Sequence, residues 1–106
     1  MRDLRHSNIV RIIGVSGVDE SERAEICILM EFLPEGDLCH YLRKNTQISE
    51  AERLSFCYQI ADACAYIANH GLVHRDLAAR NCLLGSTGPH GYPVCKVRSL
   101  HMVEDV

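Results

Sequence analysis

Apolar and polar positions along the chain follow the periods of short strands and helices. The segments 9–16 and 26–32 are rich in β-branched and other apolar residues, which is typical of strands. A charged turn is expected between them, from Asp19 to Glu22. The two segments therefore predict a β-hairpin.

Turn-forming residues follow the second predicted strand. Pro34 and Gly36 interrupt regular structure within the segment 33–37, so we expect a turn there. Asp37 closes this segment, and its carboxylate is suited to cap a helix. The sequence predicts a short helix from Asp37 to about Leu42.

A long helix is the clearest predicted element. Ser49, with Glu52 three residues later, forms a capping box, and Gly71 stands where a left-handed residue would end the helix. Between them, apolar residues recur at three- and four-residue spacing, which predicts a packed face. This stripe consists of Leu54, Cys57, Tyr58, Ala61, Cys64, Ala65 and Ala68, widened by Ile60 and Ile67.

Short strands are predicted after Gly71, at residues 72–73, 82–84 and 94–97. The Gly- and Pro-rich segment 85–93 is expected to be a loop. Its glycine spacing differs from G-x-G-x-x-G and no helix follows, so a phosphate-binding loop is excluded.

Composition limits the class of protein. The chain has 106 residues, enough for one small domain or part of a larger one, and 47% hydrophobic residues argue against disorder. A net charge of -3 argues against nucleic-acid binding, and no apolar run is long enough to span a membrane. Six cysteines without a C-x-x-C pair are expected to be reduced and mostly buried: Cys27, Cys39, Cys57, Cys64, Cys82 and Cys95.

The candidate chemistry lies in the segment 74–81, His-Arg-Asp-Leu-Ala-Ala-Arg-Asn, between two predicted strands. Phosphoryl transfer to a hydroxyl requires a carboxylate base, a positive charge near the phosphoryl group and an oxygen ligand for Mg²⁺. Asp76, Arg80 and Asn81 would supply these three groups.

Each of these residues alone has an ordinary structural explanation. Asp76 and Asn81 could be turn residues, and Arg75 and Arg80 could be solvated. His74 alone is more often a core histidine than a catalyst. The complete string in a strand–loop–strand context favours the kinase interpretation.

The string 74–81 resembles the catalytic loop of protein tyrosine kinases. Serine/threonine kinases usually have a Lys where this chain has Ala78, and Arg80 stands four residues after the Asp, as in tyrosine kinases. The resemblance implies an α+β, partial protein-kinase-like fold: N-lobe strands 4–5, hinge, helices D and E, catalytic loop and strands 6–8. Residues 1–33 would be the end of the N-lobe with the hinge, and 34–106 the start of the C-lobe.

The resemblance also implies a nucleotide site for ATP with Mg²⁺. The segment 28–33 resembles the fifth strand and the interlobe hinge, and the segment 4–10 resembles the join between helix αC and the fourth strand. By this resemblance Met30 would be the gatekeeper. Glu31 and Leu33 would offer backbone groups to adenine.

Further roles follow from the same resemblance. Asp37 would bond the ribose, and Leu83 would form the apolar floor under adenine. His74 would be structural, and Arg75 would contact the phosphorylated activation loop. The segment 81–97 is similar to that of the anaplastic lymphoma and leukocyte receptor kinase group. The substrate of the parent protein would be a protein tyrosine.

The chain departs from the family where Asp-Phe-Gly is expected, because Ser99, Leu100 and His101 stand there. The missing Asp would bind Mg²⁺, and His101 replaces a flexible Gly. Three interpretations stay open: a tyrosine kinase fragment, a pseudokinase or scaffold, and a non-functional gene-model or splice product.

The remaining parts of a kinase domain would lie outside this chain. The Gly-rich loop, the third-strand Lys and the αC Glu would precede Met1, and the activation loop and further C-lobe helices would follow Val106. The apolar stripe of the long helix would then lack its cover. We therefore expect a chain that is marginal or molten and inactive alone. Its parent would be cytoplasmic, or on the cytoplasmic side of the plasma membrane if it is a receptor.

Overall fold

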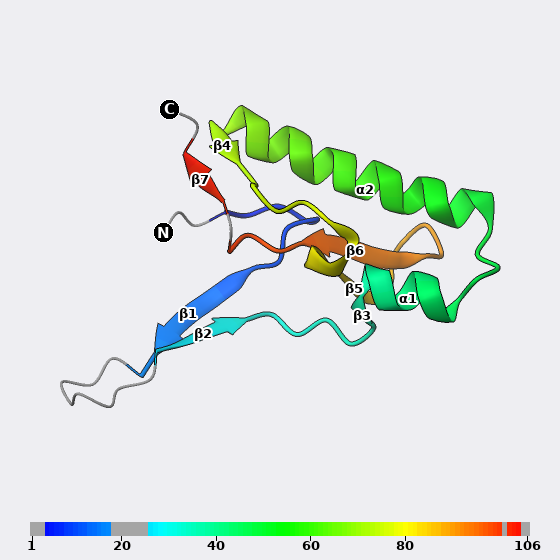
Figure 1. Cartoon of the computed structure of the whole chain (residues 1–106), viewed down its shortest axis with the longest axis horizontal. Coiled ribbons are helices and arrows are strands. Elements are labelled where there is room, and N and C mark those ends of the chain that lie inside the picture. Colours follow the sequence, from blue (N-terminus) through cyan, green and yellow to red (C-terminus); the bar gives the residue numbers. More distant parts are fainter. Residues whose placement is uncertain (1–3, 18–25, 101, 105–106) are drawn as a thin grey trace.

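The computed structural model describes residues 4–17, 26–100 and 102–104. One sheet is the predicted hairpin, in which β1 (Ile12–Ser16) pairs antiparallel with β2 (Cys27–Met30). This hairpin projects away from the long helix (Figure 1). The charged turn expected at 19–22 lies outside the described residues.

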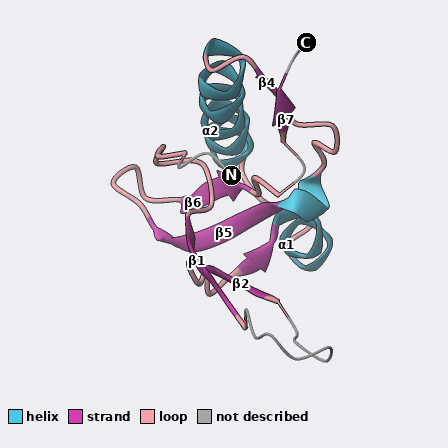
Figure 2. Cartoon of the chain, turned by 90° about the vertical axis from the view of Figure 1, so that its left-hand side faces the viewer, coloured by secondary structure: helices cyan, strands magenta, loops and turns pink. Residues whose placement is uncertain are grey.

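The other described strands form two further antiparallel sheets. They are β3 (Gly36–Asp37), β5 (Cys82–Thr87) and β6 (Pro93–Val97) in one, and β4 (Leu72–Val73) and β7 (Val103–Glu104) in the other. Figure 2 shows β5 and β6 beneath the long helix. The helix and the β5–β6 pair therefore form the two layers that enclose the core.

Several strand bounds differ from the expected ones. β5 continues to Thr87, because Thr87 still pairs with Pro93 across the hairpin. β1 begins only at Ile12, while Ile9 makes an isolated parallel bridge to Val97. The turn was expected to continue to residue 37, and this bound is wrong, because residues 36–37 form β3 and pair with β5. Such pairings join distant segments, which local patterns do not reveal.

The short helix α1 (Leu38–Lys44) begins as predicted and ends two residues later than expected. Asp37 is its N-cap, and one carboxylate oxygen accepts a hydrogen bond from the His40 backbone N–H at 2.8 Å. The cap satisfies a helix-end amide that would otherwise lack a partner.

The long helix α2 (Glu50–Asn69) has Ser49 as its N-cap, as predicted, but the Glu52 carboxylate accepts from the Tyr41 hydroxyl at 2.7 Å. The Ser49 hydroxyl accepts a hydrogen bond from the Glu52 backbone N–H at 3.1 Å. Gly71 follows the helix with a φ of 66°, a left-handed conformation that favours glycine.

Helix α2 is apolar on two faces. Phe56, Ala63 and Ile67 are buried against the sheet, whereas Leu54 and Tyr58 of the predicted stripe are 62% and 73% exposed. A helix that is apolar on more than one side is typical of the interior of a larger domain.

The core lies between α2 and the β5–β6 pair (Figure 1). Its buried residues come from both ends of the described chain and from its centre. They are Ile9, Leu38, Phe56, Ala63, Ile67, Leu72, Cys82, Leu84, Cys95 and Val97.

All six cysteines are free thiols, as expected. The expectation that most of them are buried is wrong, since only Cys82 and Cys95 are. Cys57 is exposed on α2, and Cys27 is exposed on the hairpin. Both positions are apolar in pattern but face surfaces that this chain does not cover.

A buried polar network joins α2, β6 and the segment before β1. The Asn8 amide donates to the Cys95 carbonyl at 2.9 Å and to Gln59 Oε1 at 3.1 Å. Gln59 Oε1 also accepts from the Cys95 backbone N–H at 2.7 Å, and Gln59 Nε2 donates to the Pro93 carbonyl at 3.2 Å. Because buried polar groups require partners, this network determines how β6 lies against α2.

We predict that the isolated 106-residue chain unfolds without a sharp thermal transition. The hairpin has open edges and α2 exposes Leu54 and Tyr58, so little apolar surface is removed from water. Near-ultraviolet circular dichroism during heating measures this. Replacing Leu54 and Tyr58 with Gln should reduce self-association without sharpening the transition. A sharp, cooperative transition of the unmodified chain would contradict the prediction.

Candidate active site

The segment 74–81 forms a loop between β4 and β5, as predicted, and it closes with a short 3₁₀ helix (Ala79–Asn81). Arg75 has a φ of 56°, the one positive φ among the described non-glycine residues. Left-handed non-glycine residues are strained and gather at functional sites. This backbone conformation therefore marks the loop as a candidate site.

His74 holds the loop from inside. Its side chain is buried, and Nδ1 accepts a hydrogen bond from the Asp76 backbone N–H at 3.2 Å. Nε2 faces the Arg98 carbonyl oxygen, which can only accept, so we assign the proton to Nε2. His74 thus joins the loop to the segment after β6, which supports the structural role that the resemblance implied.

The structure brings the three predicted catalytic residues together. The Asp76 carboxylate accepts from Arg80 Nη2 at 2.6 Å and from Asn81 Nδ2 at 2.9 Å. Asn81 Nδ2 also donates to the Asp76 main-chain oxygen at 2.9 Å. Asn81 is buried and its main-chain carbonyl accepts from the Arg98 backbone N–H, while its side chain is held by the two hydrogen bonds to Asp76.

The Asp76–Arg80 ion pair matters for geometry more than for stability. The side chains are 37% and 65% exposed, and exposed ion pairs contribute at most about 1 kcal/mol. The pair instead orients a partly exposed carboxylate and keeps a guanidinium beside it. A base and a cation in this arrangement suit transfer of a phosphoryl group to a hydroxyl.

The described residues fit Mg²⁺ poorly. Asn81 uses its amide nitrogen on Asp76, which leaves one neutral side-chain oxygen as a ligand. Ser99 lines a cavity of about 260 Å³ beside Leu72 and Met102. Its neutral hydroxyl is a weaker ligand for Mg²⁺ than a carboxylate would be. No cluster of three acidic, His or Cys side chains occurs among the described residues. Mg²⁺ prefers anionic oxygen ligands. His101 lies outside the described residues.

The predicted hinge residues follow β2. Met30 is its last residue and is half-buried. The Glu31 backbone N–H donates to the Arg11 carbonyl at 2.9 Å, so this N–H is not available to a ligand. Leu33 lies over β5, where a Cβ at Gly85 would come within 3.2 Å of its side chain. The glycine therefore allows this close approach.

Asp37 and Leu83 are adjacent, because their backbones are register partners between β3 and β5. Leu83 is half-buried, whereas its neighbour Leu84 is completely buried in the core. Since successive strand residues point to opposite faces, Leu83 lies on the face away from that core. This placement is compatible with a floor under adenine. The Asp37 carboxylate serves as a helix cap, as described above.

An ion pair between Glu31 and Lys96 was not expected from the sequence. Lys96 Nζ lies 3.0 Å from Glu31 Oε2 and 3.2 Å from Oε1, and Oε1 also accepts from the Arg11 backbone N–H at 2.7 Å. Burial raises the pKa of Glu31, but the hydrogen bonds from Arg11 and Lys96 and their charges outweigh it, so the pKa is lowered overall. Lys96 stands between two buried residues of β6, and this alternation predicts that its side chain lies on the sheet face away from the core. The alternation does not predict Glu31 as the partner of Lys96, because Glu31 is 65 residues away.

Comparison with known proteins identifies the family. Residues 1–106 match the protein tyrosine and serine/threonine kinase family. Discoidin domain-containing receptor tyrosine kinase B of Caenorhabditis elegans is 40% identical over 85 residues, 80% of this chain and 10% of that protein. Fer-related kinase 1 of the same species is 40% identical over 86 residues, which are 81% of this chain and 21% of that protein. Human tyrosine-protein kinase TXK is 40% identical over 88 residues, which are 82% of this chain and 16% of that protein.

The chain therefore belongs to the protein tyrosine and serine/threonine kinase family. Its relatives are tyrosine kinases, and the chain is a fragment of a tyrosine kinase domain with a partial protein-kinase-like α+β fold. It spans only about a tenth to a fifth of the length of these relatives. Similarity to the anaplastic lymphoma and leukocyte receptor group stays a prediction. None of the described helices has the length and hydrophobicity needed to cross a bilayer.

We predict that Lys96→Met raises the pKa of Glu31. The fold lowers the pKa of Glu31 below its ordinary value of 4.5. The ionised carboxylate therefore stabilises the folded chain above pH 4.5, and this stabilisation is lost as the pH falls through the pKa of Glu31 in the folded chain. Removing Lys96 leaves burial, which favours the neutral acid, opposed only by the hydrogen bond and charge of Arg11. Carbon-13 NMR of the Glu31 carboxyl against pH measures this. Lys44→Met, on exposed α1, is the control, and equal pKa values in both variants would contradict the prediction.

Proposed function

We propose that the parent protein transfers the γ-phosphate of ATP to protein tyrosine. The arrangement of Asp76, Arg80 and Asn81 carries this proposal. In it, Asp76 orients the tyrosine hydroxyl and takes its proton, and Arg80 lies near the transferred phosphoryl group. Asn81 would offer its side-chain oxygen to Mg²⁺. Arg75, exposed beside this site, would contact a phosphorylated activation loop.

The nucleotide would lie between the hinge and β5. Met30 would be the gatekeeper, and the backbone groups of Glu31 and Leu33 would face adenine. Asp37 would bond the ribose, and Leu83 would form the floor. The contact of Leu33 with Gly85 supports a close approach of hinge and floor. Residues 1–33 would then be the end of the N-lobe with the hinge, and 34–106 the start of the C-lobe.

A pseudokinase or scaffold role is the second candidate, and Ser99 is the observation that favours it. A neutral hydroxyl cannot replace the carboxylate that would chelate Mg²⁺ between the phosphates. Under either proposal the parent is cytoplasmic, or lies on the cytoplasmic side of the plasma membrane if it is a receptor.

We predict that the isolated 106-residue chain transfers no phosphate. The described donor set fits Mg²⁺ poorly, and phosphoryl transfer depends on positioning by the metal and by groups around the phosphates. Labelled ATP with poly-Glu-Tyr is the assay, and Asp76→Asn is the matched variant. Transfer by the unmodified chain that Asp76→Asn abolishes would overturn the prediction.

A chimera tests the parent activity. This chain replaces the corresponding segment of the catalytic domain of Fer-related kinase 1, which is 40% identical to it. We expect activity only after Ser99→Asp, Leu100→Phe and His101→Gly, with a gain of at least about a hundredfold. A folded chimera that stays inactive after this change would favour the scaffold role. Full activity without the change would show that Ser99 does not impair transfer.

A further inference from the structure

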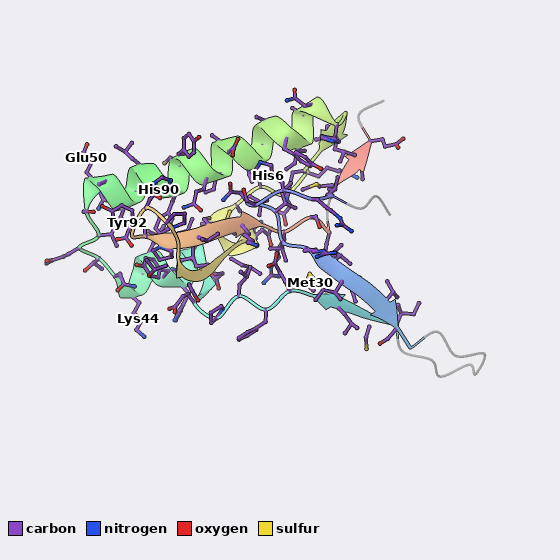
Figure 3. All side chains as sticks on the ribbon, turned by 180° about the vertical axis from the view of Figure 1, so that it is seen from behind. His6, Met30, Lys44, Glu50, His90 and Tyr92 are labelled. Carbon is purple, nitrogen blue, oxygen red and sulfur yellow. The ribbon has the colours of Figure 1, made fainter. Side chains whose placement is uncertain are left out.

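A pocket of about 320 Å³ lies beside Glu31 of the predicted hinge. It is formed by the segment 4–6, by residues 9 and 11 before β1, by Glu31 and by Lys96. Figure 3 views the molecule from behind and labels His6, which lines this pocket, and Met30, the residue before Glu31. None of the roles proposed above uses Arg5, Arg11 or Lys96.

The lining of the pocket is positive. Among the described residues, its lining carries the basic side chains of Arg5, Arg11 and Lys96 and the carboxylate of Glu31. That carboxylate is already bound by Lys96 and by the Arg11 backbone N–H. Arg11 is exposed, so its guanidinium is available at the rim. A ligand of this pocket is therefore expected to be an anion.

The pocket also has an apolar part. Leu4 is half-buried and belongs to the lining, whereas Ile9, also in the lining, is only 1% exposed, so Leu4 supplies the apolar surface. An apolar wall beside cations suits a ligand that joins an aromatic ring to an anionic group. A phosphotyrosine side chain has this composition, and guanidinium groups bind phosphate with two parallel hydrogen bonds. A glutamate side chain brings one charge and no ring.

We propose that this pocket binds a phosphotyrosine side chain of a protein segment. The phosphate lies at the rim against Arg11 and Lys96, and the ring lies toward Leu4. Phosphotyrosine is the product of the reaction class to which this family belongs, so the ligand is available where such a kinase acts. Binding requires no transfer by this chain and is independent of Asp76.

Titration of the folded chimera with Fer-related kinase 1, using phenyl phosphate, the side-chain analogue of phosphotyrosine, tests the proposal. Phosphorus-31 NMR line broadening reports binding. We expect Arg11→Gln to weaken the affinity about tenfold, because a charge-assisted hydrogen bond is lost. Arg11→Lys should recover part of the affinity. Arg43→Gln, an exposed arginine of α1, is the matched control and should leave the affinity unchanged.

Competition experiments separate this ligand from other anions. Phenyl phosphate should bind more tightly than benzoate, which lacks the phosphate, and than inorganic phosphate, which lacks the ring. Asp76→Asn should not change its affinity, so the result stands whether or not the parent transfers phosphate. Equal binding of benzoate or of inorganic phosphate, or equal affinities of the Arg11→Gln and Arg43→Gln variants, would overturn the proposal.

Discussion

The hydrogen bonds of Asn8 and Gln59 are the constraint on which the rest of this structure depends. They satisfy the backbone of β6 from two other segments, one before β1 and one in the middle of α2. The same strand carries Lys96 and leads to Arg98, whose backbone bonds His74 and Asn81. The loop that holds Asp76 is therefore positioned from the side of the core, through β6, before any ligand arrives.

Local chemistry was predictable from the sequence, and long-range pairing was not. The caps at Asp37 and Ser49 and the end of α2 at Gly71 depend on neighbouring residues, so the pattern located them. The eight residues 74–81 likewise predicted a common site for Asp76, Arg80 and Asn81, and these three side chains are hydrogen-bonded to one another. The pairing of residues 36–37 with β5 and of Lys96 with Glu31 involves segments far apart in the chain. No periodicity within either segment encodes those partners.

The candidate site is complete in one part and deficient in another. Asp76, Arg80 and Asn81 are held by hydrogen bonds of 2.6 to 2.9 Å, which is the geometry a base and its neighbours need. Where the resemblance to kinases places a metal-binding carboxylate, this chain has Ser99. The segment 74–81 and Ser99 are separate in the sequence, so one can match the family while the other departs from it.

The two apolar faces of α2 have a consequence for such a chain in a cell. One face is buried against the sheet, but Leu54 and Tyr58 on the other remain in contact with water. Chaperones and proteases act on proteins with little stability, and a loss of 1–2 kcal/mol already changes abundance several-fold. Produced without a covering partner, this segment would be kept at a low steady-state level by degradation. Its abundance would then report whether the rest of a kinase domain, or a substitute for it, is bound to that helix.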